Sequence, residues 1–583
     1  MIRKVFLSAI VILAFFLRVV SLKDFPTGFT ADEAAQGYTA YSILKTGRDE
    51  WGVKFPLNPR SFGDYKAPVY TYLIIPSIAI FGLNEFAVRL PNAILGTLAV
   101  LVVYLLFKEL FSHESMRMLS RLPAEALRFR GAKVGINANS QALIASFLLA
   151  ISPWHISLSR GAFEANLTTF FLPLAVLFFL RGLHNSRQRG GQALFIILSS
   201  FFFGLNLFTY HSARLVTPLL LVFLIFCCRK RLTEKVIYKH KFICVTSAII
   251  FLFFVFLGGL SFIGGGGTRV SDIGVFSGGW QAVSEQRFFA NSMGLPDFIS
   301  RIFNNKLSFV WGEFIKNYFS YLSPQFLFTQ GAGEATYGMT PGRGVLYFME
   351  LPFLLAAFYF LFKEKLDLVI FLWFWVLISS IPAALSRGVG YHANRVAVMM
   401  PAIQILSAYG ALTLIDLVRK RFPKFLKLFL LFYSSTLLLS FIFFLEDYFF
   451  QAPKINAPKM SYGWREAMNY LKDQDKEIII SRSFSEPQAF VMFYGKLDPK
   501  KVQSETQSWL RYEKEGHFFV DQMGNYTLAN YEFRNFSFPE DWQKGEVVLV
   551  GTEKDFLGQE KMLQEKIIGY PDGKVAIKII EIK

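Results

Sequence analysis

Long apolar segments, repeated along most of the chain, constrain the fold of this protein more than any other feature of its sequence. After an N-terminal run that ends at Val20, they lie near residues 86–108, 139–152, 166–182, 192–209, 212–228, 241–263, 345–362, 366–384, 396–416 and 426–445. Several approach the roughly 20 residues that a helix needs to cross the hydrocarbon core of a bilayer. The sequence therefore predicts a polytopic α-helical membrane protein with about 11 transmembrane helices.

The composition supports this class. Of the 583 residues, 53% are hydrophobic and 66 are Phe, which is too apolar for a soluble globular protein. The first apolar run has the length of a signal peptide, but no small-residue cleavage site follows it and many more apolar runs do. We therefore interpret the N-terminal run as the first transmembrane helix.

The positive charges predict the orientation in the membrane. The formal charge of +18 could suggest a nucleic-acid partner, but most Lys and Arg residues lie in short segments between the apolar runs, so we expect no nucleic acid. The apolar stretch Pro68–Gly82 is short and begins with proline, which favours a helix at the membrane interface over a span. The basic segments then fall on one side, the cytoplasmic side: Arg3–Lys4, 117–133, 187–189, 229–241, 363–365 and 419–427.

Two regions follow from this topology. Residues 1–446 form the transmembrane domain, with extracytoplasmic loops at 23–85 and 264–344. Residues 447–583 change character, because their apolar runs shorten to strand length at 477–480 and 547–550 and alternate with helix-like stretches such as 464–471. The sequence predicts a small, soluble α/β domain on the extracytoplasmic side.

An acidic pair, Asp32 and Glu33, lies in the first of these outer loops, directly after the first apolar run. One interpretation is catalytic, because a carboxylate at the membrane surface can act as a general base. The other is structural, because Asp32 has the sequence context of an N-cap for a helix that begins at Glu33. From the residues alone both interpretations stay open.

An ordered set of motifs carries a family resemblance. The segments are 30–34 (TADEA), 63–70 (GDYKAPVY), 86–91 (FAVRLP) and 152–166 (SPWHISLSRGAFEAN). In this order they resemble the GT-C membrane glycosyltransferases, specifically the branch that is similar to protein O-mannosyltransferases and aminoarabinose transferases and uses a polyprenyl-phosphate sugar as donor. The resemblance is good over about the first 215 residues, weaker to about 445 and absent beyond.

The resemblance implies catalytic roles for three carboxylates. Asp32 matches the acidic position of the first outer loop and would be the general base, with Glu33 orienting it or raising its pKa by proximity. Glu164 matches the second acidic position, near the acceptor or a metal. It follows Arg160 by four residues, so an interfacial ion pair of little energetic value is the alternative interpretation.

Basic residues at the outer ends of the apolar runs are candidates for holding the donor phosphate. The resemblance places Lys66 at the lipid phosphate, with a snorkelling lysine as the alternative. Arg160, Arg214 and Arg395 are further candidates, because guanidinium groups bind phosphate well. Polar residues beside them, expected to support the acceptor or the local structure, are Asp64, His211 and His392; Arg343 and Arg269 are more remote candidates.

The resulting hypothesis is an inverting glycosyltransferase that moves a sugar from polyprenyl phosphate to an extracytoplasmic protein, lipid or cell-surface glycan. The expected partners are the lipid-linked donor, that acceptor and the bilayer itself. No cofactor is certain, and a divalent metal stays open because relatives on this fold differ. The alternative from another class is a transporter or flippase of lipid-linked saccharides, although the sequence shows no internal repeat and its polar clusters gather on one face.

Overall fold

The computed structural model describes residues 2–112, 138–184, 189–233, 241–266, 274–276, 279–333, 338–340, 342–364, 367–386, 391–557 and 564–582. Several residues used in the sequence analysis lie outside these ranges, namely the basic segment 117–133, Arg187, residues 234–240 of the segment 229–241, Lys365 and Arg269.

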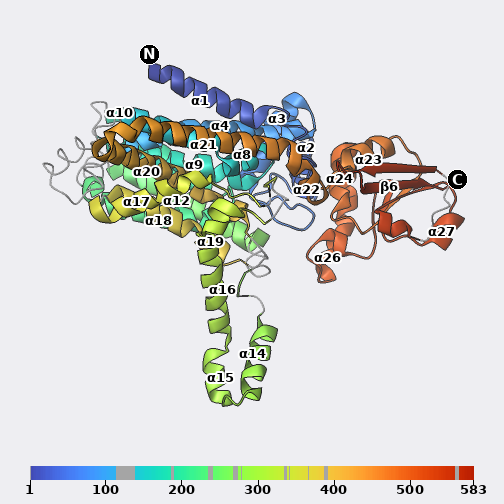
Figure 1. The fold of residues 1–583 in the computed structure, drawn as a ribbon. Coiled ribbons are helices and arrows are strands. Elements are labelled where there is room, and N and C mark those ends of the chain that lie inside the picture. Colours follow the sequence, from blue (N-terminus) through green and yellow to red (C-terminus); the bar gives the residue numbers. More distant parts are fainter. Residues whose placement is uncertain are drawn as a thin grey trace.

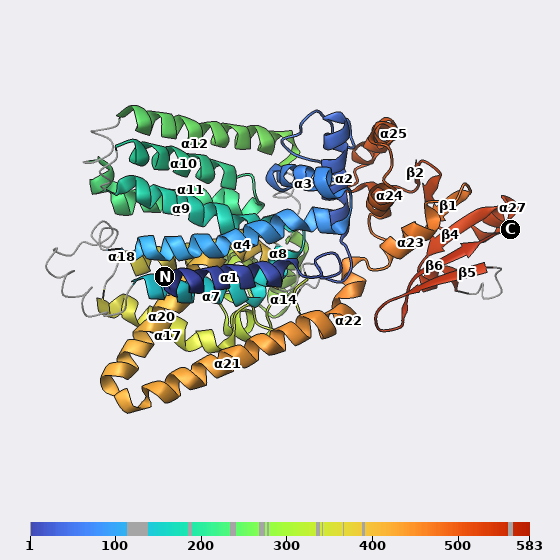
Figure 2. The same cartoon turned by 90° about the horizontal axis from the view of Figure 1, so that it is seen from above.

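Helices form the first three quarters of the chain, and the longest of them run side by side (Figure 2). Before the long outer loop they are α1 (Ile2–Val19), α2 (Ala31–Thr46), α3 (Pro68–Phe81), α4 (Glu85–Leu110), α7 (Ala138–Ile151), α8 (Pro153–Arg160), η1 (Glu164–Leu167), α9 (Thr168–Leu183), α10 (Arg189–Asn206), α11 (His211–Arg231), α12 (Lys241–Ser261) and η3 (Phe262–Gly266). After it come η6 (Phe348–Glu350), α17 (Leu351–Glu364), α18 (Asp367–Ser379), α19 (Ile381–Ala384), η7 (Ala393–Met399), α20 (Met400–Arg421), η8 (Pro423–Phe425), α21 (Leu426–Glu446), η9 (Asp447–Gln451), α22 (Ala452–Asn456) and η10 (Ala457–Met460).

Within the described ranges, six helical segments are long and apolar enough to cross a membrane, and a seventh results if α7 and α8 count as one span. These two helices meet at an angle of 55°, where Ser152 and Pro153 interrupt the apolar run. Shorter apolar helices include α3, α10 and α18. The protein is thus a mainly helical, multi-pass membrane protein, but the expected number of about 11 spans is not confirmed, because several apolar runs form helices below the spanning length.

The last quarter of the chain contains a six-stranded mixed sheet in the order β2-β3-β1-β4-β6-β5. Its strands are β1 (Glu477–Ile480), β2 (Tyr526–Leu528), β3 (Tyr531–Phe533), β4 (Val547–Gly551), β5 (Gln564–Gly569) and β6 (Val575–Glu581). Its helices are α23 (Trp464–Leu471), α24 (Pro487–Gly495), α25 (Pro499–Glu505), η11 (Thr506–Leu510), α26 (Arg511–Lys514), η12 (Val520–Gln522), α27 (Phe538–Gln543) and η13 (Glu553–Phe556). The central strand β1 pairs in parallel with both β3 and β4. The predicted C-terminal α/β region is therefore present.

This α/β region packs directly on the first outer loop. Buried apolar side chains of α2, α3 and α24 belong to one continuous core, in which the ring centroids of Phe29 and Phe493 lie 4.8 Å apart. The Tyr38 hydroxyl donates a hydrogen bond to the Leu497 carbonyl oxygen over 2.9 Å. As a result, residues from both ends of the chain meet at one end of the helical bundle (Figure 1).

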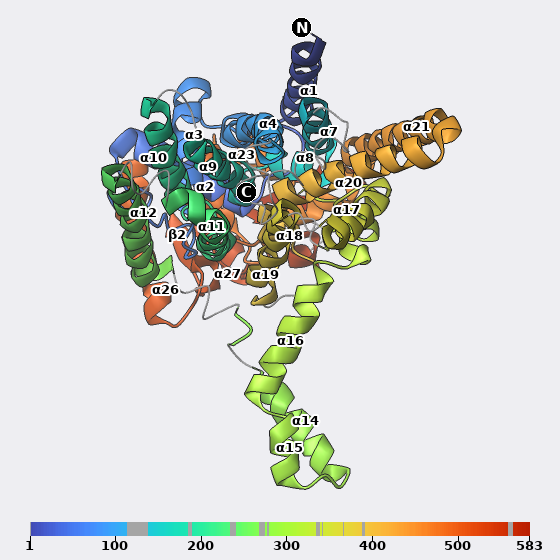
Figure 3. The same cartoon turned by 90° about the vertical axis from the view of Figure 1, so that its left-hand side faces the viewer.

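The long outer loop contains a helical hairpin that leaves the bundle sideways. Its helices are α14 (Trp280–Ser292), α15 (Asp297–Phe303) and α16 (Lys306–Ser320), and η4 (Gln325–Thr329) leads the chain back. In a view along the long helices, the hairpin projects sideways out of the bundle (Figure 3).

Candidate active site

The N-terminus of α2 is capped by Thr30. Its side chain accepts a hydrogen bond from the Glu33 backbone N–H over 3.2 Å, and the Glu33 carboxylate accepts one from the Thr30 backbone N–H over 3.1 Å. This reciprocal pair is a capping box. The interpretation of Asp32 as the N-cap is therefore wrong, because helix α2 already begins at Ala31, and the Asp32 side chain makes other contacts.

Asp32 forms an ionic group with Lys66 and Asp64. The Lys66 ammonium donates to Asp32 Oδ1 and to Asp64 Oδ2, each over 2.6 Å. The side chains of Lys66 and Asp64 are 3% and 6% exposed, whereas that of Asp32 is 38% exposed. Within this group Asp32 is thus the carboxylate that a substrate can reach from solvent, and Lys66 fixes its position.

Glu33 points away from this group. Its carboxylate receives two hydrogen bonds from the Arg89 guanidinium, over 2.8 and 3.1 Å, and one from the Ala162 backbone N–H over 2.9 Å. Both side chains of this ion pair are fully buried. Arg89 also donates to the carbonyl oxygens of Pro26 and Gly28, so the pair ties the first outer loop to α4. We interpret Glu33 as a structural anchor, a role that the sequence analysis did not anticipate.

Glu164 lies against the same face of α2 as Asp32. The Gln36 side chain donates to Glu164 Oε2 over 2.8 Å, and Gln36 follows Asp32 by one helical turn. The structure thus brings the second acidic position close to the first. Arg160 and Glu164 do not belong to one continuous helix, however, because α8 ends at Arg160 and Gly161 adopts an extended conformation.

Arg160 binds the end of the first helix. Its guanidinium donates to the carbonyl oxygens of Leu17 and Val20 over 2.8 and 2.7 Å, at the C-terminus of α1, and its side chain is buried. A cation at a helix C-terminus satisfies carbonyl groups that lack partners within the helix. These contacts favour a structural role for Arg160 over the predicted phosphate contact.

The remaining predicted residues come together on neighbouring elements. His211 and Arg214 belong to the first turn of α11, His392 directly precedes η7, and Arg395 is part of η7. The η7 segment packs against both α11 and η1, the element that carries Glu164. Arg214 also donates to the Ser261 hydroxyl over 3.4 Å, at the end of α12. Arg214 and Arg395 are therefore placed at the same end of the bundle as the carboxylates.

Glu486 is a site residue that the sequence analysis missed. It precedes Pro487 at the start of α24, with a left-handed backbone (φ 47°), and its backbone N–H donates to the Asp521 carboxylate over 3.3 Å. Burial and the negative charges of Asp521 and Asp32 raise the pKa of Glu486 to about 8. The α/β region thus contributes a carboxyl group whose charge is repelled by that of Asp32. The sequence around Glu486 contains no signal beyond that of a helix start.

The comparisons with known proteins identify the fold. The family described as dolichyl-phosphate-mannose-protein mannosyltransferase matches residues 65–129, a segment that begins one residue before Lys66. Among solved structures, ArnT from Cupriavidus metallidurans, bound to undecaprenyl phosphate, superimposes with a TM-score of 0.50 at 12% identity, over 98% of this chain and 97% of that chain. This chain has the GT-C glycosyltransferase fold.

Two further matches cover a smaller share of the proteins compared. The candidate mannosyltransferase YkcB of Bacillus subtilis is 24% identical over 185 residues, which is 32% of this chain and only 22% of the relative's length. The archaeal oligosaccharyltransferase AglB from Archaeoglobus fulgidus, in complex with an inhibitory peptide and a dolichol-phosphate, has a TM-score of 0.46 at 16% identity, over 85% of this chain and 63% of that chain.

The candidate site is built from charged side chains. Among the residues that the structure describes, no three His, Cys, Asp or Glu side chains gather as ligands for one metal ion. Asp32 and Asp64 instead share the Lys66 ammonium. Arg343, one of the more remote phosphate candidates, pairs with Asp447 over 2.7 Å.

Proposed function

We propose that this protein is an inverting glycosyltransferase that transfers a sugar from a polyprenyl-phosphate donor to an extracytoplasmic acceptor. The observation that carries the proposal is the ionic group of Asp32, Lys66 and Asp64, in which a partly exposed carboxylate is held beside a buried ammonium. The matched mannosyltransferase family and the undecaprenyl phosphate bound by ArnT support a lipid-linked donor.

In the proposed reaction, Asp32 accepts the proton of an acceptor hydroxyl group. The acceptor oxygen then attacks the anomeric carbon of the sugar, a new C–O bond forms, and the bond between this carbon and the phosphate oxygen breaks. Polyprenyl phosphate leaves with the electron pair of that bond. A single displacement of this kind inverts the configuration of the anomeric carbon.

The cations near Asp32 would stabilise the leaving group. Lys66 lies next to the base, and Arg214 and Arg395 lie at the same end of the bundle, where negative charge develops on the phosphate. Glu164 and Gln36 line the face of α2 beyond Asp32 and would orient the donor sugar or the acceptor. Glu486 would bind the acceptor from the side of the α/β region.

The distribution of basic residues supports an extracytoplasmic site. Arginines and lysines occupy the last turns of α9, α11 and α20, which lie at the end of the bundle away from the α/β region (Figure 2). Cytoplasmic loops carry the excess of positive charge in membrane proteins. The site and residues 447–583 would then lie outside the cell membrane, where a water-borne acceptor can reach them.

The proposal is tested by release of sugar from a panel of radiolabelled polyprenyl-phosphate sugars, using purified protein and an extract that supplies acceptors. We expect transfer from at least one donor and a loss of about 100-fold or more in Asp32→Asn, because general base catalysis contributes this much. Asp24→Asn is the matched control, since Asp24 is an exposed carboxylate of the same loop. A chelator in the same assay tests the open question of metal dependence.

The same experiment separates the two classes of function. No transfer from any donor, combined with movement of a labelled lipid-linked saccharide across reconstituted vesicles, would favour the transporter. Transfer that Asp32→Asn leaves undiminished would assign the base to another residue. The anomeric configuration of the product, determined by NMR, tests inversion.

A further inference from the structure

The hairpin α14–α16 exposes an unusual amount of apolar surface. More than 60% of the surface of each of the following side chains is exposed: Trp280, Phe288, Phe289, Met293, Phe298, Ile302, Phe303, Leu307, Trp311 and Phe319. Soluble surfaces rarely expose apolar patches of this extent unless a partner or a membrane covers them. The function proposed above does not use these side chains.

The apolar side chains of α16 form a stripe. Leu307, Trp311, Phe314 and Tyr318 follow one another at intervals of three or four residues and therefore lie on one face of the helix. Along this stripe, Trp311 stacks on Phe314 and Phe314 on Tyr318, with ring centroids 5.9 and 5.8 Å apart. This face is continuous and aromatic.

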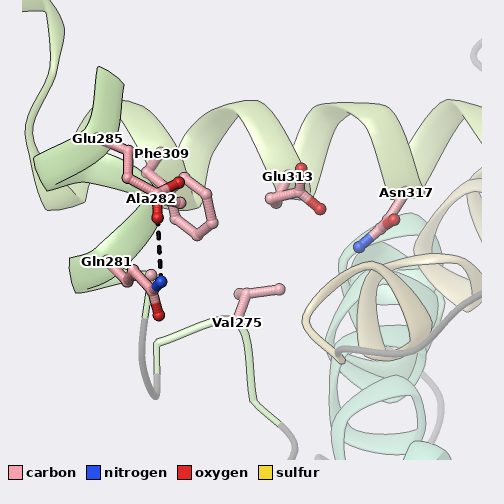
Figure 4. A pocket seen from close by; sticks show the side chains of 8 residues that line it. Val275, Gln281, Ala282, Glu285, Phe309, Glu313 and Asn317 are labelled. Carbon is pink, nitrogen blue, oxygen red and sulfur yellow. Dashed lines mark hydrogen bonds between the residues drawn. The ribbon is translucent and has the colours of Figure 1, made fainter. Parts of the chain in front are cut away.

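The opposite side of α16 carries charged residues together with Phe309, which points toward α14. Glu313 and Lys316 form an ion pair of 3.7 Å there. A pocket of about 470 Å³ separates α16 from α14, and Gln281, Glu285 and Glu313 contribute polar groups to its lining (Figure 4). The hairpin is thus amphipathic, with its polar groups between the two helices and its aromatic stripe turned outward.

The base of the hairpin is fixed at the outer end of the bundle. The Tyr318 hydroxyl donates to the Leu377 carbonyl oxygen over 3.2 Å, and Asn317 donates to the Ser386 carbonyl oxygen over 3.4 Å. Leu377 lies within the last turn of α18, and its own side chain is exposed on the surface of the bundle. The apolar stripe therefore continues the surface that the transmembrane helices present to lipid.

The direction of the hairpin is also consistent with contact between its apolar stripe and lipid. It projects sideways from the long helices rather than along them, so it extends along the plane of a membrane that those helices cross (Figure 3). Helix α14, the more polar of the two long hairpin helices, lies on the side of the α/β region, and α16 lies on the side of the bundle (Figure 1). Tryptophan residues, such as Trp280 and Trp311, favour the level of the lipid headgroups.

From these observations we infer that the hairpin α14–α16 is a membrane-surface element whose aromatic stripe inserts into the outer leaflet of the bilayer. Amphipathic helices with aromatic and aliphatic residues on one face bind in this way, with the apolar face at the boundary between headgroups and acyl chains. The occupant of the exposed surface is lipid. This assignment does not depend on the reaction that the protein catalyses.

The test places a fluorescent label on either face of α16. Cys227, Cys228 and Cys244 are changed to alanine, and Trp311→Cys or Lys316→Cys is then labelled with an environment-sensitive dye in protein reconstituted into nanodiscs. We expect lipids with a spin label near the headgroup to quench the dye at position 311 at least about twofold more than at 316. Aqueous iodide should quench the dye at position 316 more than at 311.

Two outcomes would overturn the inference. A dye at position 311 that iodide reaches as easily as at 316 would show that the stripe is in water. A dye that neither iodide nor the lipid spin labels quench would show that protein, such as a second copy of the chain, covers the stripe. If Trp311→Cys does not yield folded protein, Leu307→Cys reports on the same stripe.

Discussion

The loop 23–85 and the hairpin 280–320 differ in which side chains they bury. The loop 23–85 buries polar groups, and the side chains of the ion pairs Glu33–Arg89 and Asp64–Lys66 are almost inaccessible to solvent. The hairpin 280–320 exposes apolar groups, and its ion pair Arg301–Asp297 is open to solvent. We propose that the first segment forms the catalytic site, whereas lipid covers the apolar surface of the second.

The largest expected effect is a loss of stability when the buried ion pair Glu33–Arg89 is broken. Arg89→Met leaves the Glu33 carboxylate buried without its partner, and such a change typically costs about 3–5 kcal/mol. Thermal unfolding of the purified protein in detergent measures this loss of stability. The control, Arg301→Met in the hairpin, should cost less than about 1 kcal/mol, because its ion pair is exposed. Equal losses in the two variants would remove the distinction between the segments.

The second expected effect concerns Lys66. Lys66→Met removes the ammonium that holds Asp32 and leaves Asp64 buried without it, so we expect kcat for sugar transfer to fall about 100-fold. Lys66→Arg keeps the charge and should retain more activity than Lys66→Met. A rate for Lys66→Met close to that of the unchanged protein would show that the ionic group is not part of the catalytic site.

The third expected effect is a dependence of stability on pH. The pKa of Glu486 is about 8 in the folded protein and near its ordinary value of 4.5 in the unfolded chain. Between these values the folded state holds a proton that the unfolded state has lost, so the free energy of unfolding falls as the pH rises from about 4.5 to about 8. The slope cannot exceed about 1.4 kcal/mol per pH unit for one proton.

Glu486→Gln should remove this part of the pH dependence, as measured by denaturation between pH 5 and pH 8. Glu466→Gln is the matched control, because Glu466 is an exposed carboxylate of the same region. An unchanged pH profile in Glu486→Gln would contradict the placement of Glu486 beside Asp521 and Asp32.

The smallest expected effect is that of Trp311→Ala, for which Trp51→Ala serves as the buried reference. Trp311→Ala should change the free energy of unfolding in detergent by no more than about 0.5 kcal/mol, because the side chain is 62% exposed. Trp51→Ala should cost about 3–5 kcal/mol, because Trp51 is buried against Trp509. A large loss in Trp311→Ala would indicate that the hairpin packs against protein.

Local sequence patterns predicted the elements best where only one segment was involved. The helix 464–471 and the strand 477–480 were found with the bounds that the structure has. The cap of α2 was misassigned by two residues, because Thr30 and Asp32 are both good capping residues and only the backbone conformation at Thr30 decides between them. The count of about 11 spans is not confirmed, because hydropathy does not register where a helix breaks, as between α7 and α8.

The membrane class, the C-terminal α/β region and the candidates Asp32 and Lys66 follow from local sequence patterns, because hydrophobic period and motif order are properties of neighbouring residues. The pairing of charges follows from the packing of segments that are distant in the chain. Glu33 binds Arg89 rather than assisting Asp32, Arg160 binds the end of α1, and Glu486 reaches the site from the far end of the chain. Ion pairs are set by which segments pack together, so the residues that form them leave no periodic signal in the sequence.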